Sequence, residues 1–351
     1  MPSIRKPLIP LAPHPTNALG LTVRDYEGAM STLCAGCGHD SITAALVQTF
    51  FELDTPPEMI AKLSGIGCSS KTPTYFVSGA HGFNSVHGRM PPIVTGANAA
   101  NRNNLYIGIS GDGDSLSIGT GHFVHAIRKN VNMVYIIENN GVYGLTKGQF
   151  SPTADVGSTT KRGVPNEVPP IDPVELALSL GASFVARSFS GDKKQLIPIL
   201  KAAIEHHGFA MIDVISPCIQ FNNHQGSTKS YKYIREHELN EIDSVFLRSS
   251  SQIMAELPTD SRVSVTMHDG SLIAFRTLPE NYDPRNRTAA MNYIHEAKAK
   301  GEVPTGLLYV ESEQPDIHDL NRTTSKPLIN LPLEKLCPGK KELDRFQESF
   351  V

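Results

Sequence analysis

Two short loops in this chain carry polar residues that suit a divalent cation beside a phosphate group. Asp112 lies in the sequence GDGD (111–114), directly after an apolar run, and Asn140 lies in ENNG (138–141). They are 28 positions apart (140 − 112), which is what a turn, a helix and a strand use in a right-handed crossover. Both oxygen ligands would then meet at the carboxyl edge of one parallel sheet, where Mg²⁺ can be held with a diphosphate. The alternative is that GDGD and NNG are ordinary glycine-containing turns.

The cysteines are the second group of residues with potential chemistry. Cys34 and Cys37 lie in a C-x-x-C turn, Cys68 follows the glycine-rich sequence GIG, and Cys218 follows a strand-like run. Four thiolates from three loops can bind a [4Fe–4S] cluster or a structural zinc ion, and we favour the cluster. A disulfide between Cys34 and Cys37 is a third option. Cys337, in the C-terminal tail, is expected to have no role.

The order of apolar and amphipathic segments predicts an α/β fold. Strand-like runs alternate with helix-like segments between residues 40 and 220, which is typical of a mostly parallel sheet with helices on both faces. The expected strands are 104–110, 131–137, 182–189 and 209–216, and the expected helices are 41–53, 119–130, 173–181 and 193–207.

We divide the chain into three regions. Residues 1–30 carry prolines at positions 2, 7, 10, 13 and 15, which predict an extended arm lying across a partner surface. Residues 31–225 form the predicted cofactor-binding domain, and residues 226–351 form a C-terminal extension that packs on this domain or on a partner. Within the extension we expect helices near 241–257 and 287–299, a hairpin around 268–271, a strand at 307–311 and an irregular tail.

Composition excludes two broad classes of function. The net charge is −3 and 19% of the residues are charged, so nothing in the balance favours nucleic acid as a partner. No apolar run reaches the roughly 18 residues that a membrane-spanning helix needs, and the proline-rich start does not have the pattern of a signal peptide. We therefore expect a cytoplasmic protein that binds neither nucleic acid nor membrane.

Taken together, the motifs resemble the β subunit of 2-oxoacid:ferredoxin oxidoreductases, most of all the two-subunit 2-oxoglutarate:ferredoxin oxidoreductases, over residues 30 to 225. The resemblance implies the thiamine-diphosphate-binding fold, with Mg²⁺ bound by Asp112, Asn140 and the carbonyl of Val142. It implies that the [4Fe–4S] ligands are Cys34, Cys37, Cys68 and Cys218. The residues it places against thiamine diphosphate are Ile66, Gly67, Ser69, Gly113, Asp114, Gly144 and Leu145.

The same resemblance suggests residues that face the substrate. Lys71 lies three residues after Cys68, where the family has a lysine associated with the 2-oxoacid carboxylate, and an ammonium group there could stabilise developing negative charge. His87 and Arg89, in the sequence HGR ahead of a helix-like segment at 96–104, are further catalytic candidates. We expect the other histidines considered to be structural, namely His39, His122 and His125.

One local departure from the family concerns the first cysteine pair. The usual W-C-P-G-C-G has lost its tryptophan and proline here, because Leu33 and Ala35 stand in their places. The cysteine ligands themselves are unchanged, so the departure affects packing around the cluster rather than its ligation.

The implied reaction is the oxidative decarboxylation of a 2-oxoacid with coenzyme A, or its reverse, as in the reverse TCA cycle. Our first choice is 2-oxoglutarate to succinyl-CoA, with electrons passing through the [4Fe–4S] cluster to ferredoxin, and pyruvate is the second choice. A non-oxidative thiamine-dependent decarboxylase or synthase would leave the cysteines idle, and an electron-transfer or zinc-stabilised scaffold subunit would leave the magnesium motif unexplained.

The resemblance also implies a partner chain. The glutamate that activates thiamine diphosphate belongs to the family's pyrimidine-binding domain, and only a diphosphate-binding domain is visible in this sequence. We therefore expect an α subunit that carries the pyrimidine-binding domain, in an (αβ)₂ heterotetramer. A ferredoxin-like module with repeated C-x-x-C-x-x-C motifs is not found in the sequence, so one cluster is expected in this subunit.

Overall fold

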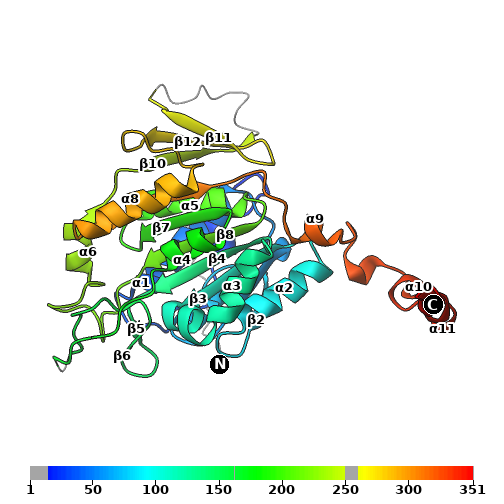
Figure 1. The fold of residues 1–351 in the computed structure, drawn as a ribbon, viewed down its shortest axis with the longest axis horizontal. Coiled ribbons are helices and arrows are strands. Elements are labelled where there is room, and N and C mark those ends of the chain that lie inside the picture. The colour runs from blue at the N-terminus through cyan, green and yellow to red at the C-terminus, as the bar shows by residue number, and fades with distance from the viewer. Residues whose placement is uncertain (1–14, 162, 250–259, 351) are drawn as a thin grey trace.

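The molecule is organised around a seven-stranded sheet (Figure 1). The structure, a computed structural model, describes residues 15–161, 163–249 and 260–350. The strand order is β14-β7-β8-β4-β3-β1-β2, and every neighbouring pair is parallel except β14 with β7. The strands are β1 (Ile60–Ser64), β2 (His81–Asn84), β3 (Leu105–Gly111), β4 (Met133–Asn139), β7 (Phe184–Phe189), β8 (Phe209–Ile215) and β14 (Gly306–Val310).

Helices cover both faces of this sheet. Helices α1 (Gly38–Glu52) and α5 (Lys193–Ile204) pack against each other on one face. On the other face α3 packs between α2 and α4, and α8 lies beside α4 (Figure 1). This second group consists of α2 (Met90–Ala100), α3 (Thr120–Arg128), α4 (Pro173–Leu180) and α8 (Arg287–Ala299). Because both faces are covered, the central strand β4 is buried along its whole length, as expected for parallel sheets.

The predicted strands and helices of the region from residue 40 to 220 are confirmed, with boundaries shifted by a few residues. Strand β1 and the edge strand β2 were not anticipated. The helix-like signal at 96–104 belongs to a helix that starts earlier, at Met90, with Pro91 and Pro92 in its first turn. Proline is tolerated there because the first backbone N–H groups of a helix have no partner within the helix.

The C-terminal region adds a small antiparallel sheet of β10 (Asp243–Leu247), β12 (Leu272–Thr277) and β11 (Val263–Thr266). The expected hairpin around 268–271, helix 287–299 and strand 307–311 are confirmed. The expected helix near 241–257 is wrong at 243–247, and residues 250–259 lie outside the described residues. Ile242, Val245 and Phe246 have helical spacing, but pairing of β10 with β12 decides the conformation.

Shorter elements complete the chain. The described part of the N-terminal arm packs on its own domain, where the buried Tyr26 hydroxyl donates to the Thr55 carbonyl. After β14 the chain leaves the body through α9 (Ile317–Asn321) and continues into an exposed tail (Figure 1). The remaining elements are β5 (Val142–Tyr143), β6 (Gln149–Phe150), α6 (Tyr231–His237), β9 (Glu238–Leu239), β13 (Val303–Pro304), α10 (Leu333–Leu336) and α11 (Lys340–Glu348).

The length and hydropathy of each helix decide whether it could cross a membrane. Within the described ranges, every helix is too short or too polar to cross a bilayer.

Candidate cofactor site

A small pocket opens where β1, β3 and β4 end, at the carboxyl edge of the sheet. In parallel α/β sheets this edge is the usual position of ligand sites. All of the sequence-predicted magnesium and thiamine-diphosphate residues line the pocket, and Cys68 and His87 lie in the same wall. The predicted lining residues are Ile66, Gly67, Ser69, Asp112, Gly113, Asp114, Asn140, Val142, Gly144 and Leu145.

Asp112 is held rigidly at the base of this pocket. It directly follows β3, and only 2% of its surface is exposed. Its Oδ2 accepts hydrogen bonds from the backbone N–H of Gly141 at 3.0 Å and from the hydroxyls of Thr153, at 2.6 Å, and Ser151. Burial raises the pKa of this carboxyl above its usual value even though these three donors oppose the shift. A buried carboxylate of this kind is a good ligand for a cation.

Asn140 follows the neighbouring strand β4, and its loop is fixed by the chain itself. The side-chain Oδ1 accepts the backbone N–H of Val142 at 3.0 Å, and the backbone carbonyl accepts the Nδ2 of Asn222 at 2.8 Å. The Oδ1 of Asn222 is buried and has no hydrogen-bond partner in the part of the chain that the structure describes. A carbonyl-type oxygen has two lone pairs, so Asn140 Oδ1 can still bind a cation.

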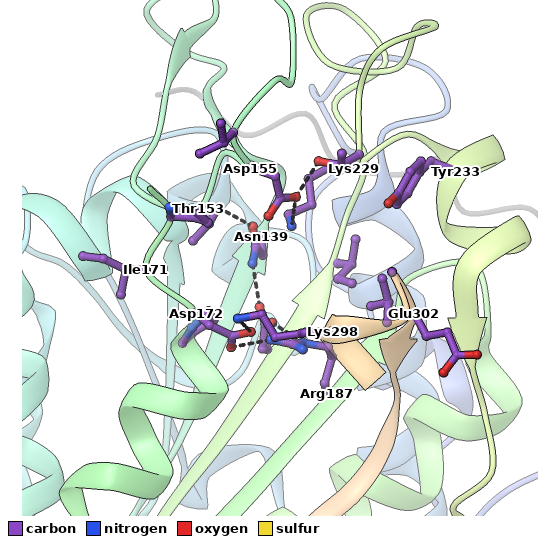
Figure 2. Close-up of a pocket in the computed structure, with 18 residues that line it drawn as sticks. Asn139, Thr153, Asp155, Ile171, Asp172, Arg187, Lys229, Tyr233, Lys298 and Glu302 are labelled. Carbon is purple, nitrogen blue, oxygen red and sulfur yellow. Dashed lines mark hydrogen bonds and ion pairs between the residues drawn. The ribbon is translucent and has the colours of Figure 1, made fainter. Parts of the chain in front are cut away.

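Behind Asp112 lies a chain of polar contacts that sequence reasoning missed. Figure 2 shows four of its members, Thr153, Asn139, Arg187 and Asp172. Thr153 also contacts Asn139 Oδ1 at 2.8 Å, and Asn139 Nδ2 donates to Asp213 Oδ1 at 2.9 Å. Arg187 then joins Asp213, at 2.8 Å, to Asp172, at 2.5 Å. The β7–β8 register places Arg187 directly opposite Asp213. The sequence signal for this ion pair was that one apolar strand contains a single arginine and the other a single aspartate.

The electrostatics of this network favour its charged form. Burial by itself would raise the pKa of Asp172, but the charges of Arg187 and Lys298 outweigh it and hold that pKa at about 2. Burial would lower the pKa of Arg187, and the two carboxylates raise it instead. Asp172 and Arg187 therefore stay ionised near neutral pH, and the network forms a fixed support under Asn139 and Thr153.

Asp114 ties three loops of the pocket together. Its Oδ1 accepts the backbone N–H of Gly88 at 2.6 Å and of Ile66 at 3.3 Å and contacts His87 Nδ1, and its Oδ2 accepts the Ser110 hydroxyl at 2.5 Å. The predicted cofactor residue Asp114 is thus engaged by protein donors on both oxygens. Its contacts indicate that it positions the loops that surround the cofactor pocket.

Four cysteines gather next to the same pocket. A Cβ placed on Gly144 would lie 3.5 Å from the sulfur of Cys68 and 3.6 Å from that of Cys218. All four are free thiols, so the disulfide between Cys34 and Cys37 that we kept as a third option is not formed. Burial, helped by the neighbouring Glu138 and Cys218, raises the pKa of Cys37 to about 12. Such thiols need a metal to become thiolates at neutral pH.

The remaining predicted residues divide into two groups. His87 lines the pocket, whereas Lys71 and Arg89 are not part of its lining. Lys71 lies close enough to Cys68 for its charge to oppose the raised pKa of that thiol, and Arg89 is exposed with Nη1 donating to the Ile118 carbonyl at 3.3 Å.

Two buried residues in the pocket wall were not selected from the sequence as functional. Glu138 accepts the Thr72 hydroxyl at 3.0 Å, and burial raises its pKa well above the usual value. His39, which we expected to be structural, lies 3.5 Å from it and bonds the Ser216 hydroxyl at 2.7 Å. Burial lowers the pKa of His39 to about 4, so the imidazole is neutral at physiological pH. The only signal for Glu138 was its position directly before the two asparagines.

The fold and this pocket define a thiamine-diphosphate-binding domain, and the comparison with family models agrees. Residues 65–214 match the model "Thiamine pyrophosphate enzyme, C-terminal TPP binding domain". The matched segment contains both magnesium motifs, Cys68 and the whole network behind Asp112.

Comparison with individual relatives narrows the class to one family. The chain is 46% identical over 209 residues to a 2-oxoacid:ferredoxin oxidoreductase subunit beta of Saccharolobus solfataricus, covering 59% of this chain and 68% of the relative. It is 42% identical over 192 residues to the 2-oxoglutarate oxidoreductase subunit KorB of Mycobacterium tuberculosis, covering 54% of this chain and 51% of the relative. The chain belongs to the family of 2-oxoacid:ferredoxin oxidoreductase β subunits and is thus a subunit of an oxidoreductase.

A solved structure supports the same assignment over a longer range. A 2-oxoglutarate:ferredoxin oxidoreductase of Magnetococcus marinus, determined with 2-oxoglutarate, coenzyme A and succinyl-CoA bound, superposes with a TM-score of 0.69 at 31% identity. The match covers 86% of this chain and 89% of that chain, so it extends beyond the thiamine-binding domain.

Proposed function

We propose that this chain is the β subunit of a 2-oxoglutarate:ferredoxin oxidoreductase, which interconverts 2-oxoglutarate and succinyl-CoA and exchanges electrons with ferredoxin. The observation that carries the proposal is that the magnesium pocket and the cysteine cluster share one wall, at Gly144. A thiamine enzyme without redox chemistry has no use for four cysteines beside its cofactor. Electron transfer from cofactor to cluster, in contrast, requires the two to be close.

In this proposal Asp112, Asn140 and Val142 hold Mg²⁺, and the glycines of the two loops leave room for the diphosphate. A Cβ on Gly113 would lie 2.2 Å from the Tyr143 ring, so only glycine allows this close packing of the two loops. Thiamine diphosphate, when bound, supplies the decarboxylation chemistry of the 2-oxoacid. The chain contributes the fixed oxygen ligands, and Glu138 and neutral His39 provide buried polar groups in the pocket wall.

The spacing of the cysteines favours an iron–sulfur cluster over zinc. Four sulfurs bound to a single zinc ion at about 2.3 Å lie only about 3.8 Å from one another. Among the described residues, which include all four cysteines, no three cysteine sulfurs lie within 4.8 Å of one another. A cube-shaped cluster binds its cysteines at four separated iron atoms and therefore suits this wider arrangement.

Substrate binding is assigned to cations near the pocket. Lys71, next to Cys68, is proposed to attract the carboxylate of the 2-oxoacid, and His87 at the pocket wall and Arg89 at its exposed side are further candidates. The proposed substrate is 2-oxoglutarate, and pyruvate is the alternative.

An exposed apolar rim supports the proposal of a partner α subunit. Leu145 lines the pocket and is 51% exposed, and Val86, directly before His87, is 74% exposed. Phe83, on the edge strand β2, and Ile118 are also exposed. Apolar side chains gathered around a binding site indicate a protein interface. We propose that the pyrimidine-binding domain of the α subunit covers this rim in an (αβ)₂ assembly.

The test is to purify the chain anaerobically with its co-expressed partner and to measure iron, acid-labile sulfide, zinc and 2-oxoacid-dependent reduction of ferredoxin. We expect about four irons and four sulfides per αβ unit and the highest activity with 2-oxoglutarate and coenzyme A. Cys337→Ser is the matched control, because Cys337 is exposed and far along the tail. Stoichiometric zinc without iron, or decarboxylation without ferredoxin reduction, would contradict the proposal.

A further inference from the structure

A second group of metal-ligating side chains lies outside the cofactor site. His207, in the turn between α5 and β8, faces Asp316 and Asp319, which belong to the first turn of α9. One ligand atom from each of these three residues lies within 4.8 Å of the others. The group sits where the chain leaves the body toward the exposed tail (Figure 1).

The geometry of Asp316 distinguishes this group from an ordinary surface cluster. Asp316 is completely buried, and its Oδ1 is fixed by the backbone N–H groups of His318 at 2.7 Å and Asp319 at 3.0 Å. Its Oδ2 lies 3.1 Å from His207 Nε2, yet it has no hydrogen-bond partner among the described residues. A buried carboxylate oxygen without a hydrogen bond is costly.

A shared metal ion explains this arrangement. Ligands at about 2.0–2.1 Å from a tetrahedral zinc ion lie about 3.3 Å apart and direct their lone pairs at the ion rather than at each other. The distance between His207 Nε2 and Asp316 Oδ2, 3.1 Å, is close to this value, and the contact lacks the direction of a hydrogen bond.

The group of His207, Asp316 and Asp319 is held by hydrogen bonds on the Asp316 side and is open to solvent on the side of His207 and Asp319. The backbone N–H of Ile317 donates to the Asn130 carbonyl at 3.1 Å, and Asn130 Nδ2 donates to the Pro315 carbonyl at 3.0 Å. These bonds fix the segment that carries Asp316. The His207 side chain is 32% exposed and Asp319 is exposed, so an ion and its water can enter from solvent. His268 stacks on the His207 ring, with centroids 4.6 Å apart.

We propose that His207 Nε2, Asp316 Oδ2 and a carboxylate oxygen of Asp319 bind one Zn²⁺ ion, with water in the remaining position. One imidazole with two carboxylates suits zinc better than the all-oxygen sites that Mg²⁺ prefers. The ion would fasten α9 to the α5–β8 turn and so set the point from which residues 322–350 extend. This inference does not depend on the proposed reaction, because none of the three residues lines the cofactor pocket.

The experiment uses the αβ complex with its iron content measured, dialysed to equilibrium against buffered Zn²⁺, and compares wild type with His207→Gln and Asp319→Asn. We expect the wild type to bind one zinc ion per chain at this site. In each variant the affinity for this zinc ion should be at least about tenfold lower, with unchanged iron content. His295→Gln is the matched control, because His295 is an exposed histidine 3.8 Å from a single carboxylate, that of Glu175.

Asp319→Asn protects the test against misfolding, since the side chain is exposed and an asparagine oxygen can still accept the Asp316 backbone N–H that now donates to Asp319 Oδ2 at 3.3 Å. Added Zn²⁺, but not Mg²⁺, should raise the melting temperature of wild type and of His295→Gln more than that of the two site variants. Equal zinc binding in wild type, His207→Gln and Asp319→Asn would show that His207 and Asp316 form only an ion pair and would overturn the inference.

Discussion

The proposed oxygen ligands and the proposed sulfur ligands of this subunit lie side by side but are built in different ways. Asp112 and Asn140 directly follow two neighbouring parallel strands, β3 and β4, whose register pairs Gly111 with Glu138. Asp112 is buried and accepts three hydrogen bonds. The cysteines come from three loops, and Cys34 is exposed while the other three are half-buried.

We infer from this difference that the protein fixes the proposed oxygen site before the cation binds, whereas the proposed sulfur site is completed only when the cluster binds. The proposed oxygen ligands are fixed by the sheet and by the polar network behind them, so in our proposal the binding of Mg²⁺ requires little reorganisation. Burial raises the pKa of Cys37, Cys68 and Cys218, so these three thiols are protonated when no metal is present. In our proposal, cluster binding therefore releases protons from them.

The largest effect should come from removing one sulfur. In Cys68→Ser, we expect loss of the cluster and of more than about 99% of ferredoxin reduction, because the electron path is interrupted, while the thiamine-diphosphate affinity changes little. Iron analysis and calorimetric titration of the cofactor measure the two sites independently. If Cys68→Ser lost thiamine-diphosphate binding as well as the cluster, the oxygen site would depend on the sulfur site for its structure.

The reciprocal substitution is Asp112→Asn. The amide keeps the shape of the side chain but removes the charge that binds the cation, so we expect the affinity for Mg²⁺ with thiamine diphosphate to fall roughly 100-fold or more. Iron and sulfide content should stay at the wild-type level. A cluster that is lost in this variant would contradict the independence of the two sites.

The same contrast explains what the sequence could and could not predict. GDGD and the asparagine pair could be placed at one sheet edge because each follows a continuous apolar strand, and strand periodicity is a local property. The contact of Arg187 with Asp213 depends on which strands become neighbours and in which register, which local patterns do not encode. The pocket wall around Glu138 was missed for the same reason.

The missed β10 and the substrate candidates show two further limits. Helical spacing of apolar residues at 242–246 was real, but a distant strand, β12, determined the conformation. Lys71 and Arg89 were selected by motif, and whether such side chains line a pocket depends on turns whose geometry has no periodic signal.

The network behind Asp112 can be tested through stability. Arg187→Met leaves the buried carboxylate of Asp213 without its cation and leaves Asp172 with Lys298 alone, so we expect the free energy of unfolding to fall by about 3–5 kcal/mol. Arg285→Met is the control, because Arg285 pairs with Asp283 on the surface, where such pairs contribute about 0–1 kcal/mol. Chemical denaturation measures both. A small effect at Arg187 would mean that the network does not support the oxygen site.

The pH dependence of stability should follow from the same ion pairs. The pKa of Asp172 is held at about 2, below its ordinary value of 3.8. Its contribution to stability is therefore complete above pH 3.8 and is lost as the pH falls toward 2. In Arg187→Met the pKa of Asp172 should rise, so this loss begins at a higher pH. Superimposable acid-unfolding profiles of wild type and variant would exclude this coupling.

The smallest expected effect is that of a single hydroxyl between the network and the oxygen site. Thr153 contacts Asp112 and Asn139 at 2.6 and 2.8 Å, so Thr153→Val should loosen Asp112 without altering the volume of the side chain. We expect the Mg²⁺ affinity to fall by about tenfold, as for other residues that orient a metal ligand. Thr153→Ser keeps the hydroxyl and should restore most of the affinity. If valine and serine behaved alike, the site would owe its rigidity to the strands alone, because the hydroxyl would then be dispensable.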